Sequence, residues 1–281
     1  MNINTAIALD DQPPLETIKA QHKATWEDGD YARFAKYMQD GAVEVLESWN
    51  IVPSTTLLDV GCGAGQTAIP AAELGIQVTG IDLAENLVEY ARRRTQEADL
   101  NARFDVGDAE DLPYADQHYD VVISMFGAMF APRPGRVTDE FARVLKHGGR
   151  LFMANWTPTS MPAQMFKAVS AIVPPPAGTI SPVLWGDPTT VKQRLGDDFT
   201  DIRLTRRCYP QWHYPFGADE LVNLFRSYFG PVKLAFDKSD AADQLNLHQS
   251  LKQIYQSNSV MKNSKLTITG GEYLEVVATR R

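Results

Sequence analysis

The residues best placed to do chemistry stand between a buried apolar run and three alternating glycines. Residues 56–60 read Thr-Leu-Leu-Asp-Val, and Gly61, Gly63 and Gly65 follow directly. Glycine is needed where a backbone adopts a positive φ, or where a ligand comes closer than a Cβ allows. A helix that begins at Gln66 would point its N-terminus at the same ligand. The pattern is typical of a loop that binds a nucleotide-like cofactor.

The spacing of these glycines narrows the kind of cofactor. The dinucleotide fingerprint is G-x-G-x-x-G, whereas here Gln66 stands where the third glycine would fall. An acid, Asp59, also precedes the first glycine by two positions. A nicotinamide-dependent oxidoreductase stays open as an alternative, but the spacing and the absence of a Tyr-x-x-x-Lys pair from the sequence argue against it.

Two further acids follow later strands of the pattern. Short apolar runs alternate with helical patterns, which predicts an α/β fold with a doubly wound, mostly parallel sheet. Ligands of such sheets bind outside the carboxyl ends of the strands. Asp82 ends the second strand, and its two oxygens can accept hydrogen bonds from both ribose hydroxyls. Asp108 follows the third strand and can accept from an exocyclic amine such as that of adenine. The predicted strands span residues 56–60, 77–81, 102–106, 119–124 and 151–155.

Composition limits the partners and the compartment. The net charge of −8 and the pI near 5.2 argue against nucleic acid, whose binding depends on Lys and Arg neutralising phosphates. The basic run Arg92–Arg94 is expected to close a helix and face solvent. No apolar run approaches the ~20 residues of a membrane span. Only two cysteines occur, which favours a reducing, cytoplasmic compartment. Residues Met1 to Pro14 contain no Lys or Arg, so no secretory signal is expected.

Several motifs in order resemble a known family. They are the run from Leu57 to Gly65, the acid Asp82, the run Gly107-Asp108-Ala109-Glu110-Asp111-Leu112-Pro113, the strand Tyr119-Asp120-Val121-Val122 and the turn Leu145-Lys146-His147-Gly148-Gly149. Together they resemble the class I S-adenosylmethionine-dependent methyltransferases. The resemblance is closest to the small-molecule branch that includes the ubiquinone and menaquinone biosynthesis C-methyltransferases. It is good over about residues 55 to 155 and loose elsewhere.

The resemblance implies a Rossmann-like, seven-stranded sheet whose last strand is antiparallel, and it implies roles for individual residues. The glycine loop would pack against the methionine part of S-adenosyl-L-methionine, with Asp59 near the amino group. Asp82 would hold the ribose, and Asp108 with the Ala109 amide would hold the adenine. The product would be S-adenosyl-L-homocysteine. The candidate cofactor-binding residues are Tyr31, Asp59, Gly61, Cys62, Gly63, Gly65, Asp82, Leu83, Asp108, Ala109, Ser124 and Met125.

Physical chemistry agrees with this cofactor, although each residue has a simpler alternative. The cofactor carries a sulfonium cation and lacks a pyrophosphate, so acidic neighbours suit it better than an anion-binding helix terminus. The acids could also be ordinary strand-end caps, and Cys62 a small loop residue. Trp26 and Tyr31 could be core residues rather than cofactor contacts.

The rest of the chain is expected to close over this site. Residues 1–50 are predicted to form an N-terminal helical flank or lid, and residues 51–281 the catalytic domain. Irregular or helical cap insertions are expected at about 156–190, which is proline-rich, and at 209–264. Residues 266–269 and 273–278 are expected to form a final strand pair or one bent strand.

The methyl acceptor is predicted to be small and apolar. The loop after the fourth strand, residues 124–130, lacks the Asn/Asp-Pro-Pro-Tyr/Phe run, the Pro-Cys dipeptide and the acid pairs of other methyltransferase classes, so no metal is expected. An oxygen or an activated carbon of a small apolar metabolite, either aromatic or prenylated, is the preferred acceptor. The candidate substrate residues are Phe126, Phe130, Trp156, Trp185 and Trp212.

A hydroxyl acceptor would need a base, and His213 is the candidate because imidazole titrates near neutral pH. The alternative is a histidine with a structural role. A non-catalytic S-adenosylmethionine-binding protein also stays open, because the cofactor motifs alone do not require catalysis. The sequence does not predict the oligomeric state.

Overall fold

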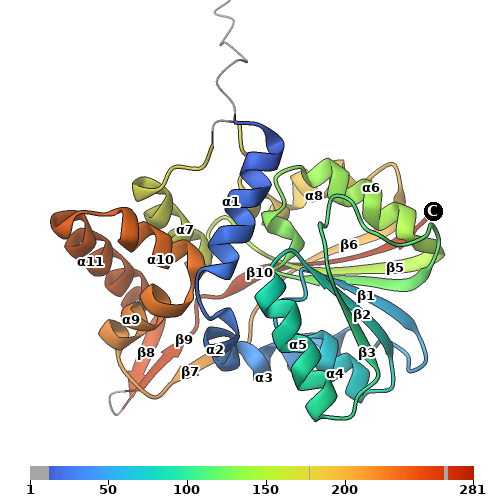
Figure 1. Ribbon diagram of the computed structural model, residues 1–281, viewed down its shortest axis with the longest axis horizontal. Helices are drawn as coiled ribbons and strands as arrows, with labels where there is room; N and C mark the ends of the chain where they lie inside the picture. The colour runs from blue at the N-terminus through green and yellow to red at the C-terminus, as the bar shows by residue number, and fades with distance from the viewer. Residues whose placement is uncertain (1–12, 177, 263–264) are drawn as a thin grey trace, which may run out of the picture.

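The computed structural model describes residues 13–176, 178–262 and 265–281. Its centre is a seven-stranded sheet in the order β3-β2-β1-β4-β5-β10-β6 (Figure 1). Strands β1 to β5 pair in parallel, and β10 runs antiparallel to both β5 and β6. The predicted seven-stranded sheet with an antiparallel last strand is therefore confirmed. The strands are β1 (Thr56–Val60), β2 (Gln77–Asp82), β3 (Ala102–Val106), β4 (Tyr119–Met125), β5 (Leu145–Trp156), β6 (Phe199–Cys208) and β10 (Glu272–Arg280).

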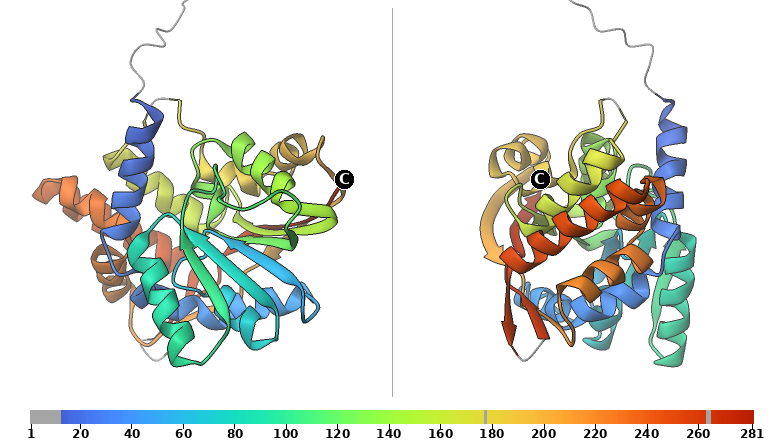
Figure 2. Two further views of the ribbon diagram at one scale, coloured as in Figure 1. Left: turned by 45° about the vertical axis from the view of Figure 1, so that its right-hand side comes forward. Right: turned by 90° about the vertical axis from the view of Figure 1, so that its left-hand side faces the viewer.

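Helices cover both faces of this sheet (Figure 2). Strand β1 is buried from Leu57 to Val60 and is apolar there except for Asp59, as expected for a central strand covered on both faces. Its neighbours β4 and β5 are buried almost throughout, which places the core along the middle of the sheet. The covering helices are α3 (Gln39–Ser48), α4 (Ala68–Glu73), α5 (Glu85–Glu97), α6 (Pro134–Val144) and α8 (Pro188–Leu195).

Two local departures from the predicted boundaries have clear causes. Helix α4 begins at Ala68 rather than Gln66, so that Pro70 falls in its first turn, where the missing amide hydrogen has no partner to lose. Strand β5 begins at Leu145 rather than Leu151, because Leu145 already pairs with Tyr119 of β4.

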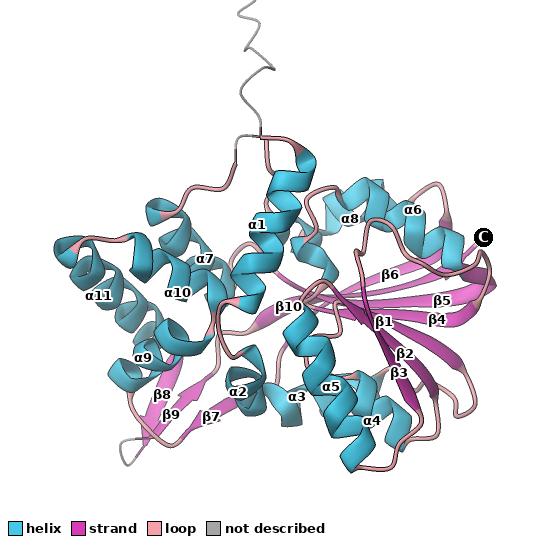
Figure 3. Cartoon of the chain, viewed as in Figure 1, coloured by secondary structure: helices cyan, strands magenta, loops and turns pink. Residues whose placement is uncertain are grey.

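A second group of elements lies beside the sheet (Figure 3). It contains α7 (Met161–Ile172), α9 (Ala218–Tyr228), α10 (Gly230–Lys238) and α11 (Ala241–Ser257), together with a three-stranded sheet in the order β7-β9-β8. Strands β7 (Trp212–Tyr214), β8 (Ser259–Lys262) and β9 (Lys265–Ile268) form this sheet. The predicted strand pair at 266–278 is therefore wrong, since β9 and β10 belong to different sheets.

The N-terminal helices connect these two parts. Helix α1 (Leu15–Glu27) lies between the α10 side of the second group and α5 of the sheet (Figure 1). The short α2 (Tyr31–Ala35) begins after Asp30, whose side chain accepts from the Arg33 amide and caps the helix. Residues 1–12 of the expected flank lie outside the described residues. Within the described part, no helix has the length and apolar character of a membrane span.

Candidate active site

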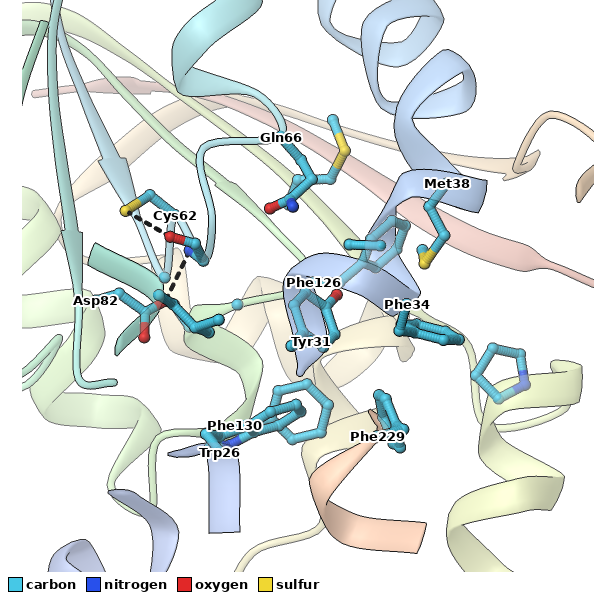
Figure 4. A pocket seen from close by; sticks show the side chains of 18 of the residues that line it. Trp26, Tyr31, Phe34, Met38, Cys62, Gln66, Asp82, Phe126, Phe130 and Phe229 are labelled. Atoms are coloured by element: carbon cyan, nitrogen blue, oxygen red, sulfur yellow. Dashed lines mark hydrogen bonds between the residues drawn. The ribbon is translucent and has the colours of Figure 1, made fainter. Parts of the chain in front are cut away.

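A cavity opens at the carboxyl ends of β1 to β5, where the sheet, the N-terminal helices and the second group meet (Figure 4). Its wall has two parts. The first part, named the cofactor part because it contains residues that the sequence predicts to bind a cofactor, consists of the loops after β1, β2, β3 and β4 and includes Gly61, Gly63, Asp82 and Asp108. The second part, here named the acceptor bay, is apolar and is lined by Trp26, Phe34, Met38, Phe126, Phe130, Trp156, Met161, Met165, Phe166, Tyr209, Trp212, Tyr214, Phe225 and Phe229.

The glycine loop has the backbone shape that the sequence predicts. Gly61, Gly63 and Gly65 have φ angles of 73°, 53° and 83°. These are left-handed values that favour glycine. A Cβ on Gly61 would lie 2.6 Å from the Cα of Gly127, so the loop after β1 touches the loop after β4 backbone to backbone. Gly61 and Gly63 line the cavity, whereas Gly65 packs against Ile69 behind it.

Asp82 anchors this loop while it faces the cavity. One carboxylate oxygen accepts from the Gly63 amide at 2.8 Å, and the other accepts from the Ala84 amide at 2.9 Å. Burial raises the pKa of Asp82, and these amide bonds act in the opposite direction. Tyr31 lies above the loop, and burial together with the Asp82 charge raises the pKa of its phenol to about 12. Asp82 thus orders the glycine loop and keeps a carboxylate at the cavity wall.

Asp59 lies beneath the loop rather than on the cavity wall. Its side chain is 1 % exposed, and Oδ2 accepts from the Thr67 hydroxyl. Oδ1 has no hydrogen-bond partner among the described residues. Burial raises the pKa of Asp59 to about 7, and the nearby Asp82 charge acts in the same direction. Thr67 itself lines the cavity, so its hydroxyl connects the buried Asp59 carboxyl to the cavity wall.

Asp108 has both carboxylate oxygens engaged. Oδ1 accepts from the Glu110 amide at 2.8 Å, and Oδ2 accepts from the ammonium of Lys19 on α1. Lys19 also lies 2.9 Å from Glu110, whose side chain is fully buried and pairs with Arg133. The neighbouring Ala109 lines the cavity, as do Leu83 and Met125 after β2 and β4.

Phe126 stands where the cofactor part meets the acceptor bay. Its φ of 57° is unusual for a residue with a side chain and is the kind of local strain that collects at functional sites. The amide donates to Ala154 at 2.9 Å, and the ring stacks on Trp156 with centroids 3.7 Å apart. Tyr209 meets both rings edge-on. The strained backbone therefore places an aromatic wall beside the cofactor loops.

Besides Asp59 and Gly65, three further sequence-predicted site residues, Ser124, Trp185 and His213, lie away from the cavity. The Ser124 hydroxyl donates to Val60 and accepts from Ala128, joining β4 to β1 within the core. Trp185 is 1 % exposed and lies under the Arg194 guanidinium instead of lining the bay. His213 is exposed and pairs with Thr267, because it occupies the outward position of β7 between two inward ones. The structure therefore does not bring His213 to the cavity.

The structure also brings to the cavity residues that the motifs do not indicate. Lys19, His22 and Trp26 reach it from one face of α1, and burial lowers the pKa of His22. Their spacing could have indicated that they share one helix face, since residues three and four apart lie side by side on a helix. Gln66 also lines the cavity, and its Oε1 accepts from the Ala64 amide at 3.1 Å. Tyr209 and Tyr214 come from the second group, where no motif marks them.

Known proteins match both the chain and the fold. The family described as "Methyltransferase domain" matches residues 58–153. The uncharacterised protein Rv1403c of Mycobacterium tuberculosis is 34% identical over 218 residues, 76% of this chain and 79% of that protein. The 27-O-demethylrifamycin SV methyltransferase of Amycolatopsis mediterranei is 40% identical over 110 residues, 38% of this chain and 40% of that enzyme.

The fold has the same likeness. The structure of a putative methyltransferase from Bacillus halodurans superposes with a TM-score of 0.57 at 18% identity, over 84% of this chain and 97% of that one. The glycine loop, Asp82 and the run from Gly107 lie within the matched residues 58–153. The chain belongs to the class I S-adenosylmethionine-dependent methyltransferases of small molecules, and S-adenosyl-L-methionine is its methyl donor.

Proposed function

We propose that the enzyme transfers the methyl group to an oxygen or an activated carbon of a small, apolar, aromatic metabolite. The observation that carries this proposal is the composition of the acceptor bay, whose wall consists of aromatic and methionine side chains. Such a wall removes apolar area from water, at about 25 cal/mol for each Å² of ligand surface. The Amycolatopsis relative is named for an O-demethyl compound, which supports oxygen as the acceptor atom.

The distribution of charge argues against an amine acceptor. Among the described residues that line the cavity, the carboxylates are Asp82 and Asp108, and both belong to the cofactor part. An ammonium group in the acceptor bay would therefore be desolvated without a carboxylate partner, which is costly. A neutral hydroxyl or a quinol ring does not carry that cost.

The cofactor part fits S-adenosyl-L-methionine by its donors and acceptors. We assign the ribose to Asp82 and the adenine to Asp108 and the Ala109 amide. The methionine amino group would lie near Asp59, whose buried Oδ1 accepts no hydrogen bond from the described residues. Gly61 and Gly63 line the cavity with backbone alone, and each has a positive φ that favours glycine. The bound cofactor supplies the electrophilic methyl group, and these residues bind and orient it.

In the bay, Phe126, Phe130, Trp156 and Trp212 are assigned to the acceptor. Trp212 and Tyr214 alternate inward on β7, so the same strand that turns His213 outward contributes two rings to the bay. Alignment of nucleophile, methyl and sulfur is the main contribution that such a wall makes, and for ideal placement it is worth about 7–11 kcal/mol.

Methyl-labelled S-adenosyl-L-methionine and an acceptor panel test the proposal. The panel contains phenols, naphthoquinols, carboxylic acids and primary amines of matched size. Labelled product is expected from apolar hydroxyl compounds or quinols, and its formation should fall in Phe126→Ala and Trp212→Ala. Transfer confined to the amines would contradict the proposed acceptor. Cofactor binding without transfer to any member would instead favour a non-catalytic binding protein.

A further inference from the structure

Helix α1 is held against the cofactor part by polar contacts more than by a buried face. None of its thirteen residues, all of them described by the structure, is buried, and its N-terminus has no side-chain cap. It nevertheless brings Lys19, His22 and Trp26 to the cavity wall. An element with so little buried apolar surface is one that can open at low cost.

One end of α1 is tied to the loop after β3. The Lys19 side chain is only 14% exposed and contacts two carboxylates, Asp108 and Glu110. Glu110 is itself held by the Arg133 side chain at 2.8 Å, so the acceptor of this ion pair is rigid. The Lys19 and Asp108 side chains are 14% and 26% exposed, so salt and water screen this ion pair less than a fully exposed one.

The other end of α1 is tied to the loop after β2. Glu27 accepts from the Glu85 amide at 2.9 Å, at the first residue of α5. The Glu27 carbonyl accepts from the Asn86 side chain at 3.3 Å. Helix α5 begins three residues after Asp82, the residue assigned to the ribose. Helix α1 therefore spans the two loops assigned to the adenosine part of the cofactor.

The contact with Lys19 also fixes the Asp108 side chain. One Asp108 oxygen accepts from the Glu110 amide and the other from Lys19, which together set the orientation of the carboxylate. A carboxylate oxygen has a second lone pair, so Asp108 can still accept from the adenine amine. Trp26 continues the same helix face into the acceptor bay, where it meets Phe130 and Phe229 edge-on.

We propose that Lys19 is a positioning residue for the cofactor and that α1 is a strap across it, so that S-adenosyl-L-homocysteine leaves only after the Lys19 ion pairs break. This inference rests on the proposed location of the cofactor. The strap contacts both loops assigned to the adenosine part of the cofactor, and it also contacts the acceptor bay. Release of the product is therefore coupled to opening of the acceptor bay.

The dissociation rate of S-adenosyl-L-homocysteine, measured by stopped-flow tryptophan fluorescence, tests the proposal. Lys19→Met is expected to raise that rate at least tenfold, while Lys19→Arg keeps it within threefold of wild type. Lys192→Met removes an exposed lysine from α8 and should leave the rate unchanged. Raising the salt from 50 to 500 mM should speed release from wild type and not from Lys19→Met. A Lys19→Met rate within twofold of wild type would overturn the proposal.

Hydrogen exchange keeps the test independent of any loss of stability in Lys19→Met. In wild type, S-adenosyl-L-homocysteine should slow exchange of residues 15–27, and exchange there that is insensitive to the ligand would refute the strap. Asp82→Asn tests the location of the cofactor separately. If that variant keeps wild-type affinity the proposed site is wrong, whereas weakened binding with a normal Lys19→Met rate rejects the strap alone.

Discussion

Asp59→Asn should change both the pH dependence of stability and the protons exchanged on cofactor binding. In the free protein the buried Asp59 carboxyl has a pKa of about 7, against 3.8 for an unperturbed group. Between these values the native state holds a proton that the unfolded state has lost. The contribution of protonated Asp59 to the free energy of unfolding is therefore fully present below about pH 4 and is lost as the pH rises through 7. The loss is about 1.4 kcal/mol per pH unit and about 4 kcal/mol in all.

The stability of wild type should consequently fall more steeply with pH than that of the variant. Between pH 5 and pH 8, wild type is expected to lose about 3 kcal/mol more unfolding free energy than Asp59→Asn, which cannot titrate. Denaturant unfolding of the two proteins, without cofactor, measures this difference. Asp82 titrates in both proteins, and only its coupling to the Asp59 charge differs between them.

Cofactor binding should reverse the protonation of Asp59. An ammonium group beside the carboxyl favours its ionised form, so at pH 6 wild type is expected to release close to one proton from Asp59 as the cofactor binds. Calorimetry in two buffers with different ionisation heats measures that proton. Asp59→Asn should show about one proton less and roughly 10- to 150-fold weaker binding, the range for a hydrogen bond to a charged group.

The reasoning fails if the two proteins release the same number of protons, or if their stabilities fall in parallel from pH 5 to pH 8. Thr67→Val provides a matched control, because the Thr67 hydroxyl bond lowers the Asp59 pKa. Its loss should move the proton release to higher pH and leave the number of protons unchanged.

Three further substitutions have simple expected results. Gly127→Ala should lower the melting temperature and weaken cofactor binding, because its Cβ would lie 2.4 Å from the Gly61 carbonyl oxygen. Tyr209→Phe removes the hydroxyl bond to the Met38 carbonyl and should cost about 1 kcal/mol, seen as a fall of about 2–4 °C in melting temperature. His213→Ala should leave the acceptor kinetics unchanged because the imidazole points away from the bay, and a large loss of turnover would show otherwise.

The sheet and the cofactor part could be predicted because they are encoded locally. Each of the loops after β1, β2 and β3 carries its acid or glycine next to the strand that positions it. A strand boundary therefore places Asp59, Asp82 and Asp108 at once. Their hydrogen-bond partners were not predictable, since Lys19 reaches Asp108 across 89 positions of the chain.

The sequence predicts that the acceptor bay is apolar and aromatic, but it does not predict which residues form the bay. Its rings come from α1, α2, β5, α7, β7, α9 and the loops between elements, and no local pattern says which of them meet. On β7 a shift of one residue exchanges inward and outward faces, which is why Trp212 and Tyr214 line the bay while His213 does not. Trp185 shows the same limit, because its burial under Arg194 depends on contacts made by α8.

The backbone contact between Gly61 and Gly127 has a consequence for how this enzyme can diverge. Neither position has room for a side chain, so no exchange of residues at one can compensate for a change at the other. The glycine loop and the loop after β4, where the aromatic wall begins, are therefore held together as one rigid unit. Related enzymes can accommodate new acceptors by replacing side chains on α7, α9 and β7. The distance between the glycine loop and the aromatic wall stays the same.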